Sequence, residues 1–264
     1  MNRLFTAGGE MMGWINALRP TTSMMAGILS IIGFSVTAWH PNAWLIAIFV
    51  TIGTCATMVH NDWRDRYHDI KKNKDFALNA GAWFLFYDIM LWAVAIGMIP
   101  VLGRNEPVFI AIALTIVVAG LLYSETRLIP ILPQLIVAIT SATPVLFGVL
   151  NAPCQRGWSL FWATTLLIYA SEILMDINDC GHDRGYKWTL PLAIGHRRSK
   201  FIAGVCTLFV PFVAYAATPT TLIGAPMLIW AGLELLKDAD HTRPQSVSWY
   251  ATMIVLAAIL LAGP

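Results

Sequence analysis

Six aspartates in this sequence fall into two groups with the same spacing, at positions i, i+3 and i+7. They are Asp62, Asp65 and Asp69, followed much later by Asp176, Asp179 and Asp183. At about 100° per residue, this spacing places the three carboxylates of each group on one face of a helix. Like charges so arranged repel, and a helix C-terminus carries partial negative charge, so both groups require cations. Because hard divalent cations prefer oxygen ligands, the pattern predicts a Mg²⁺ site.

Basic residues stand beside both acidic groups. They are Arg64, Arg66, Lys71, Lys72 and Lys74 around the first group, and Arg184 and Lys187 after the second. Carboxylates for a metal, mixed with Arg and Lys for anions, indicate a diphosphate site. A solvated, salt-bridged helix end is the alternative interpretation. The repetition of the same spacing in two distant segments argues against it.

The composition excludes several classes of protein. Of 264 residues, 57% are hydrophobic and only 12% are charged, and the mean hydropathy is +0.65. A soluble domain carries about 25% charged residues, so a soluble enzyme and a disordered chain are both poor interpretations. The four cysteines show no CxxC spacing, which indicates neither a zinc site nor a disulfide framework. The net charge of +2 predicts no nucleic-acid partner.

Long apolar segments predict an all-α, multi-pass membrane protein that forms a single domain over residues 1–264. A spanning helix needs about 20 mostly apolar residues, and a lipid-exposed backbone must satisfy its own hydrogen bonds. The expected spans, about nine in all, cover residues 20–39, 42–61, 80–101, 107–123, 129–150, 158–176, 200–217, 219–236 and 246–262.

The basic residues predict the orientation of the chain in the bilayer. With these spans, 15 of the 17 Lys and Arg residues lie on or next to the side that holds the N-terminus, whereas Arg104 and Arg156 lie opposite. The positive-inside rule places that side, with the N-terminus and both acidic groups, at the cytoplasmic face.

At these residues the chain resembles the UbiA superfamily of intramembrane prenyltransferases. The first group, read as Asn61-Asp62-x-x-Asp65-x-x-x-Asp69, matches that family's NDxxDxxxD motif, and the second group resembles its DxxDxxxD motif. Three further elements resemble family features: Leu18-Arg19-Pro20, Tyr123-Ser124-Glu125-Thr126-Arg127 (a YxxxK element with Arg in place of Lys), and Thr189-Leu190-Pro191. The family's Arg-Pro-rich continuation of the first motif is absent, and Lys71–Asp75 stands there instead. This departure leaves the subfamily and the acceptor open.

The resemblance implies a helical bundle around a central cavity that opens to lipid. It also implies Mg²⁺-dependent transfer of an isoprenyl group from an isoprenyl diphosphate, through an allylic carbocation, to a small lipophilic acceptor, often aromatic. The predicted metal ligands are Asp62, Asp65, Asp69, Asp176, Asp179 and Asp183. The predicted diphosphate-binding residues are Asn61, Arg66, Tyr123, Arg127, Lys187 and Arg19.

Two further carboxylates are candidate catalytic groups. Asp88 falls within the expected third span. Placing a carboxylate inside the bilayer costs free energy, so such a residue is a functional candidate by default. It would accept a proton from the acceptor, or it would make a structural contact with a neighbouring helix. Glu172 lies one turn before Asp176 on the same helix face, so it would support the metal site or act as a base.

The amino-acid sequence is also compatible with two other functions. A terpene cyclase of the same superfamily would use the site on the isoprenyl diphosphate alone, and the missing Arg-Pro stretch makes this alternative worth keeping. An ion-coupled transporter is the alternative from another class. Transporter sites lie typically near the bilayer midplane, whereas here only Asp88 lies deep in a span.

Overall fold

The computed structural model describes residues 7–72, 74–104, 106–123, 125–126, 129, 131–217 and 219–237, and all the regular secondary structure within these ranges is helical. The first half contains α1 (Ala7–Ala17), α2 (Pro20–Val36), α3 (Ala43–Asp65), the 3₁₀ helix η1 (Asp69–Lys72), α4 (Phe76–Ala80), α5 (Ala82–Leu102) and α6 (Pro107–Tyr123). The second half contains α7 (Leu132–Ala142), η3 (Thr143–Val145), α8 (Leu146–Asn151), α9 (Gln155–Asp183), α10 (Leu190–Ile194), α11 (His196–Tyr215), η4 (Pro219–Gly224) and α12 (Ala225–Leu236).

Several of these helices are long and apolar enough to cross a bilayer. Within the described ranges there are five such segments, covering Ala43–Asp65, Ala82–Leu102, Leu132–Asn151, Gln155–Asp183 and His196–Tyr215, and shorter apolar helices cover Pro107–Tyr123 and Thr221–Leu236. The protein is therefore an integral, multi-pass, all-helical membrane protein, as predicted. The expected span at 246–262 lies outside the described residues.

The helix boundaries differ from the expected spans where polar residues continue a helix beyond its apolar part. The helix α3 runs on to Asp65, and α9 extends from Gln155 to Asp183. Hydropathy marks the edge of the lipid, but the helical hydrogen bonds continue past it. The helix α1 was not expected, and its Trp14 ring packs against Phe76, Phe84 and Tyr87. Tertiary contacts thus hold a helix that lacks a long apolar run.

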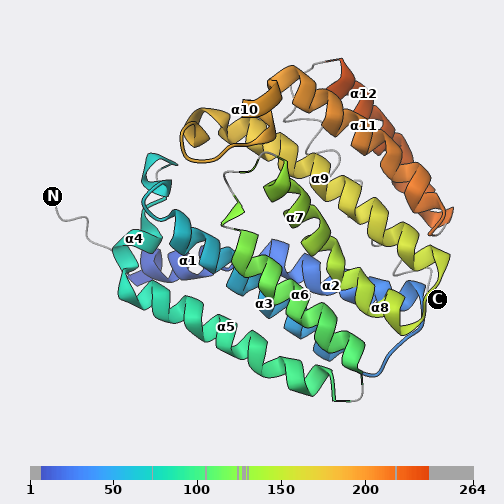
Figure 1. The fold of residues 1–264 in the computed structure, drawn as a ribbon, viewed down its shortest axis with the longest axis horizontal. Helices are drawn as coiled ribbons and strands as arrows, with labels where there is room; N and C mark the ends of the chain where they lie inside the picture. Colours follow the sequence, from blue (N-terminus) through green and yellow to red (C-terminus); the bar gives the residue numbers. More distant parts are fainter. Residues whose placement is uncertain are drawn as a thin grey trace.

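The helices pack in two connected groups (Figure 1). On one side α2, α3, α5 and α6 enclose a core that includes Phe34, Phe49, Phe109 and Phe147, while α9, α11 and α12 lie side by side on the other. Close backbone contact joins α2 to α8, since a Cβ atom on Gly148 would lie 2.3 Å from the backbone of Gly33. Only glycine permits this crossing.

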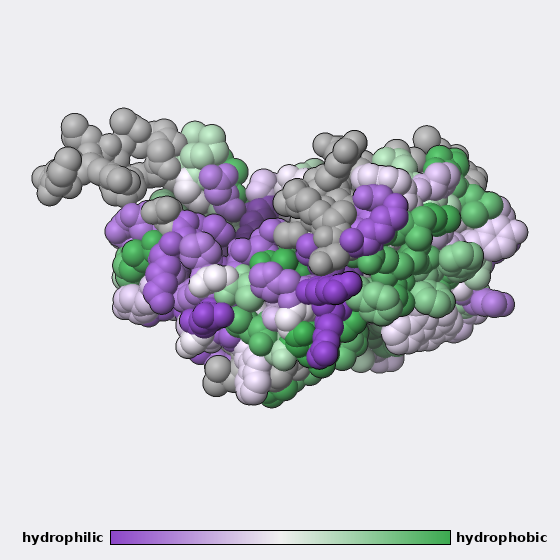
Figure 2. All heavy atoms as spheres, turned by 90° about the horizontal axis from the view of Figure 1, so that it is seen from above, coloured by the Kyte–Doolittle hydropathy of each residue, from purple (hydrophilic) through white to green (hydrophobic). Residues whose placement is uncertain are grey.

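The connections that follow α3 and α9 meet at one end of the bundle. Residues 66–72 follow α3 and residues 184–189 follow α9, and Figure 1 shows η1 near the junction of α9 with α10. The face drawn in Figure 2 carries hydrophilic residues over one part and apolar residues over the other. Exposed apolar rings, among them Phe209 and Phe212 of α11, suit contact with lipid rather than water.

Candidate functional site

The two acidic groups occupy the ends of α3 and α9. Asp62 and Asp65 lie in the last turn of α3, and the second group lies entirely within the final turns of α9. The helix α3 stops at Asp65, however, so Asp69 begins η1 instead of continuing the helical face. The expectation of one continuous helical face is therefore wrong for the first group, and it holds for the second.

The segment after α9 reaches back to the first acidic group. The Tyr186 hydroxyl donates a hydrogen bond of 2.7 Å to Asp65 Oδ1, and Lys187 Nζ lies 3.8 Å from Asp65 Oδ2. The Asp65 carboxylate is buried. These contacts bring residues more than 100 positions apart into one site.

The segment after α3 makes the reciprocal contacts with the second group. Lys72 Nζ donates to Asp179 Oδ2 at 2.6 Å and to Asp183 Oδ1 at 3.1 Å. His68 Nε2 lies 3.5 Å from Asp183 Oδ1, and the His68 ring stacks on Tyr186 with centroids 3.9 Å apart. Each connection therefore holds the carboxylates of the other helix.

Arg19 supplies a cation from the start of α2. Its guanidinium pairs with Asp62 Oδ1 at 2.9 Å. Arg19 has φ 45°, a left-handed conformation that is costly for a residue with a Cβ atom and unusual before a proline. Strained backbone of this kind concentrates at functional sites, so the conformation of Arg19 marks it as a functional candidate.

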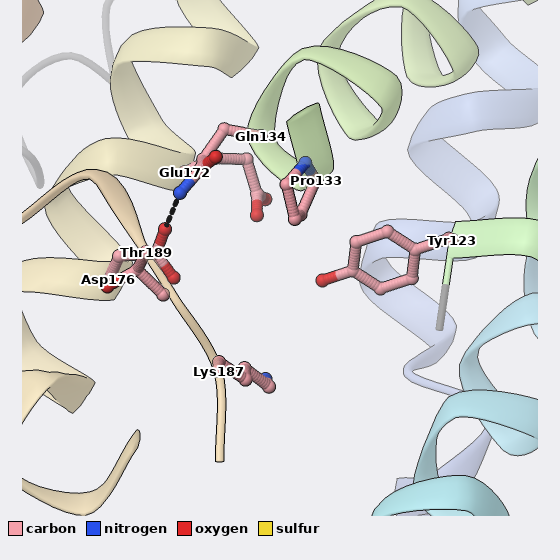
Figure 3. A pocket seen from close by; sticks show the side chains of 7 residues that line it. All are labelled: Tyr123, Pro133, Gln134, Glu172, Asp176, Lys187 and Thr189. Atoms are coloured by element: carbon pink, nitrogen blue, oxygen red, sulfur yellow. Dashed lines mark hydrogen bonds between the residues drawn. The ribbon is translucent and has the colours of Figure 1, made fainter. Parts of the chain in front are cut away.

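A small polar pocket lies beside these contacts (Figure 3). Its lining residues are Tyr123, Pro133, Gln134, Glu172, Asp176, Lys187 and Thr189. Gln134 Nε2 donates to Asp176 Oδ2 at 2.5 Å. Gln134 Oε1 and Thr189 Oγ1 are buried without a hydrogen-bond partner among the described residues. Buried polar atoms normally have partners, so the pocket offers a polar ligand unused hydrogen-bonding atoms.

Other predicted residues lie elsewhere or have different neighbours. The Arg66 guanidinium lies over the rings of Trp63 and Tyr67 and donates to the Trp63 carbonyl. Asn61 is half-buried in α3. Arg127 lies outside the described residues.

Asp88 is not at the pocket. It is 3% exposed between α5 and α3, with its Oδ2 2.9 Å from His60 Nδ1. His60 precedes Asp62 by two residues and points to a different side of α3. Of the two roles considered for Asp88 from the sequence, proton acceptor or contact with a neighbouring helix, the structure shows the helix contact.

Electrostatic effects are visible at η1, outside the membrane-spanning helices. Burial, reinforced by the charge of Asp65, raises the pKa of Asp69. Burial acts to lower the pKa of Lys72, but the hydrogen bonds and charges of Asp179 and Asp183 outweigh it and raise this pKa overall. An ammonium group between these carboxylates is thus stabilised in its charged form.

The chemistry of the site fits divalent metal ions. Among the described residues, no three His, Cys, Asp or Glu side chains are already grouped closely enough to hold a metal. Cationic side chains of the chain instead contact the carboxylates, and Lys72 in particular bridges Asp179 and Asp183. Asp183 Oδ2 is also buried without a hydrogen-bond partner in the described part of the chain. Carboxylate oxygens are the ligands that Mg²⁺ prefers, so the chemistry of these side chains suits that ion.

No individual role in the site was predicted from the sequence for Lys72, Tyr186 or Gln134. Lys72 and Tyr186 belong to the polar connections, and a signal for Lys72 existed in the basic stretch that replaces the expected Arg-Pro segment. Gln134 is a single amide in an apolar run, and its contact with Asp176 crosses 42 residues. No local pattern distinguishes it.

Comparison with known proteins identifies the family of the chain. The model of the UbiA prenyltransferase family matches residues 21–259. Digeranylgeranylglyceryl phosphate synthase of Pyrococcus abyssi is 26% identical over 96% of this chain and 98% of its own length. The Natronomonas pharaonis protein of that name is 30% identical, over 72% of each chain. A UbiA homologue from Archaeoglobus fulgidus, solved with GPP and Mg²⁺, shares the fold with a TM-score of 0.69 and 14% identity, over 94% of this chain and 98% of its own. This chain belongs to the UbiA prenyltransferase family.

Proposed function

We propose that this protein transfers an isoprenyl group from an isoprenyl diphosphate to a lipophilic acceptor, with Mg²⁺ as cofactor, at the cytoplasmic end of the bundle. The observation that carries the proposal is the mutual contact of the two acidic helix ends. Lys72 reaches the second group, while Tyr186 and Lys187 reach the first. Carboxylates and cations thus gather beside a polar pocket, at one end of helices whose outer surfaces are apolar.

The residue roles follow from charge. The six aspartates of the two groups would hold Mg²⁺, which when bound neutralises charge that develops on the diphosphate. Arg19 and Lys187, now paired with Asp62 and Asp65, would donate charge-assisted hydrogen bonds to the diphosphate oxygens. Tyr123 lines the pocket and would donate through its hydroxyl. Asn61, Arg66 and Arg127 keep the diphosphate-binding role proposed for them from the family motifs.

The proposed reaction exchanges one bond at the allylic carbon. The carbon–oxygen bond to the diphosphate breaks, and its electron pair leaves with the diphosphate. The nucleophilic atom of the acceptor then bonds to the allylic carbon and loses a proton. Glu172 lies in the pocket beside Asp176 and would receive that proton. Asp88 contacts His60 instead of the pocket, so we assign it a structural role.

The names of the relatives suggest which acceptor to test first. Those named digeranylgeranylglyceryl phosphate synthase make a product that carries a glyceryl phosphate group. We therefore propose a prenylated glyceryl phosphate, with a free hydroxyl as nucleophile, as the first acceptor class. The unpartnered oxygens of Gln134 and Thr189 could hydrogen-bond such a hydroxyl. A lipophilic aromatic acceptor is the second class.

The test uses the full chain purified in lipid nanodiscs. Diphosphate release and prenylated product are followed with GPP and longer isoprenyl diphosphates, each acceptor class, and either Mg²⁺ or excess EDTA. Asp62→Ala and Asp176→Ala should each lower turnover by at least about a hundredfold, because several kcal/mol of leaving-group stabilisation are lost. The matched control is Glu234→Gln in α12, where the carboxylate pairs with Lys237, and it should keep wild-type turnover.

The same assay separates the alternative functions. Turnover that survives Asp62→Ala or EDTA would refute the proposal. A cyclic hydrocarbon or alcohol formed from the donor alone would identify a terpene cyclase. Ion flux across proteoliposomes without diphosphate release would identify a transporter.

A further inference from the structure

Lys72 bridges two carboxylates of the second acidic group in the structure. Its ammonium contacts both Asp179 and Asp183, at 2.6 and 3.1 Å. The Lys72 side chain is 11% exposed, that of Asp183 is 1% exposed and that of Asp179 is 48% exposed, so only the contact with Asp183 is largely removed from water. Charged hydrogen bonds so sheltered are stronger than those at an open surface.

The position of Lys72 distinguishes it from the other lysines of the same stretch. Lys71 and Lys74 are exposed, whereas Lys72 ends η1 and turns toward α9. The short 3₁₀ turn from Asp69 to Lys72 therefore directs one of these lysines into the site.

A metal ion and this ammonium group cannot share the same oxygen atoms. Mg²⁺ binds oxygen at about 2.0–2.1 Å and demands near-octahedral geometry. An ammonium 2.6 Å from the same carboxylate would stand in that ligand shell, and it would repel a divalent ion strongly at such short range. Binding of a metal to Asp179 Oδ2 and Asp183 Oδ1, the oxygen atoms that Lys72 contacts, thus requires Lys72 to move.

We propose that Lys72 is a tethered counter-cation that a divalent metal displaces from Asp179 and Asp183, and that the displaced ammonium binds the diphosphate. This inference rests on the proposed function, because it takes Asp179 and Asp183 to be metal ligands. It adds Lys72 to the diphosphate-binding residues. It also means that metal binding is weakened until a diphosphate gives the ammonium another anion to bind.

The proposal predicts opposite effects of one substitution on two ligands. In Lys72→Met the competitor is gone, so Mn²⁺ alone should bind at least about tenfold more tightly, because binding no longer breaks the charged hydrogen bonds from Lys72 to Asp179 and Asp183. Inorganic pyrophosphate, added with saturating Mn²⁺, should bind about tenfold more weakly, because a charged donor to it is lost. A purely structural role for Lys72 would weaken both affinities together.

The experiment measures Mn²⁺ binding by electron paramagnetic resonance and pyrophosphate binding by calorimetry, on the full chain in detergent. Lys71→Met is the matched control, since it removes the same charge from the adjacent exposed position and reports the general electrostatic effect. Lys72→Arg keeps a cation and should bind Mn²⁺ as weakly as the wild type does. It also keeps the test decisive if Lys72→Met folds poorly, because Lys72→Arg should then retain pyrophosphate binding within about threefold.

The outcomes separate this inference from the proposed function. Tighter Mn²⁺ binding together with weaker pyrophosphate binding, in Lys72→Met and beyond the change in Lys71→Met, supports the inference. If Lys72→Met matches Lys71→Met for both ligands, or weakens both, Lys72 is not a displaceable counter-cation and the proposed function is unaffected. If the wild type binds no Mn²⁺ even with pyrophosphate, both the inference and the metal role in the proposed function are overturned.

Discussion

Substitutions of Asp88 test whether its carboxylate has a structural or a catalytic role. Asp88 is 3% exposed, and its Oδ2 lies 2.9 Å from His60 Nδ1. A hydrogen bond to a charged group contributes about 1.5–3 kcal/mol. Asp88→Ala removes that bond and leaves the His60 ring nitrogen without its partner, so we expect a loss of about 2–3 kcal/mol in the free energy of unfolding. For a chain of this size, that corresponds to a fall in thermal midpoint of about 4–12 °C.

The contact itself can be isolated with a double-mutant cycle. His60→Ala and Asp88→Ala should each destabilise the protein, and together they should cost less than the sum of the two by about 1–3 kcal/mol. Unfolding in mixed micelles, followed by tryptophan fluorescence, measures all four free energies. An additive result would show that the two side chains do not interact.

Turnover by the isosteric variant then decides the role of Asp88. Asp88→Asn can still accept a hydrogen bond from His60, but it cannot take up a proton from an acceptor. We expect its kcat to stay within about threefold of the wild type. A general base contributes about 10²–10⁴-fold. A hundredfold loss of kcat in Asp88→Asn at an unchanged thermal midpoint would therefore refute the structural assignment.

Three further substitutions test the site and the packing. Tyr186→Phe keeps the ring but removes the donor to Asp65, and it should lower the free energy of unfolding by about 1–2 kcal/mol in a denaturant titration; an unchanged stability would contradict the bond. Burial, and next the charge of Asp65, raises the pKa of Asp69 in the folded protein. Ionisation of Asp69 therefore opposes folding. The stability that protonated Asp69 contributes is lost as the pH rises through this raised pKa. Asp69→Asn should therefore raise the thermal midpoint in EDTA at pH 7, with a gain that disappears below the ordinary carboxyl pKa; a gain that is constant with pH would contradict this linkage. A Cβ on Gly148 would lie 2.3 Å from the backbone of α2, so Gly148→Ala should lower the free energy of unfolding by about 1–3 kcal/mol. The control is Gly97→Ala in α5, where a Cβ meets no atom within 4 Å, and it should be neutral or stabilising. Equal effects at the two sites would refute the packing argument.

Much of the membrane architecture could be predicted from local pattern. The expected span 107–123 coincides with α6, and the break after the first span coincides with the end of α2 at Val36 and the start of α3 at Ala43. Apolar runs of about 20 residues have few alternatives in a bilayer, because the backbone must satisfy its own hydrogen bonds there. The ends of α3 and α9 were harder to predict because polar residues continue both helices beyond the lipid.

The candidate site could likewise be predicted only in part. Spacing alone pointed to both acidic groups, since repeated carboxylates at helical intervals need compensating cations wherever the helices lie. The identity of those cations could not be predicted. Lys72 and Asp179 are 107 residues apart, and three lysines in the same stretch are equivalent by sequence. Only the turn of η1 selects one of them.

The sequence by itself determined that this chain is a bundle of membrane helices with two acidic helix ends, because these properties depend on hydrophobicity and on charge at helical spacing. The tertiary structure alone decided which side chains meet. It placed Lys72 on the second acidic group, Tyr186 on the first, and Asp88 against His60 instead of in the pocket. Such contacts depend on how the helices pack and how the connections turn, and these are set by interactions between residues far apart in the chain.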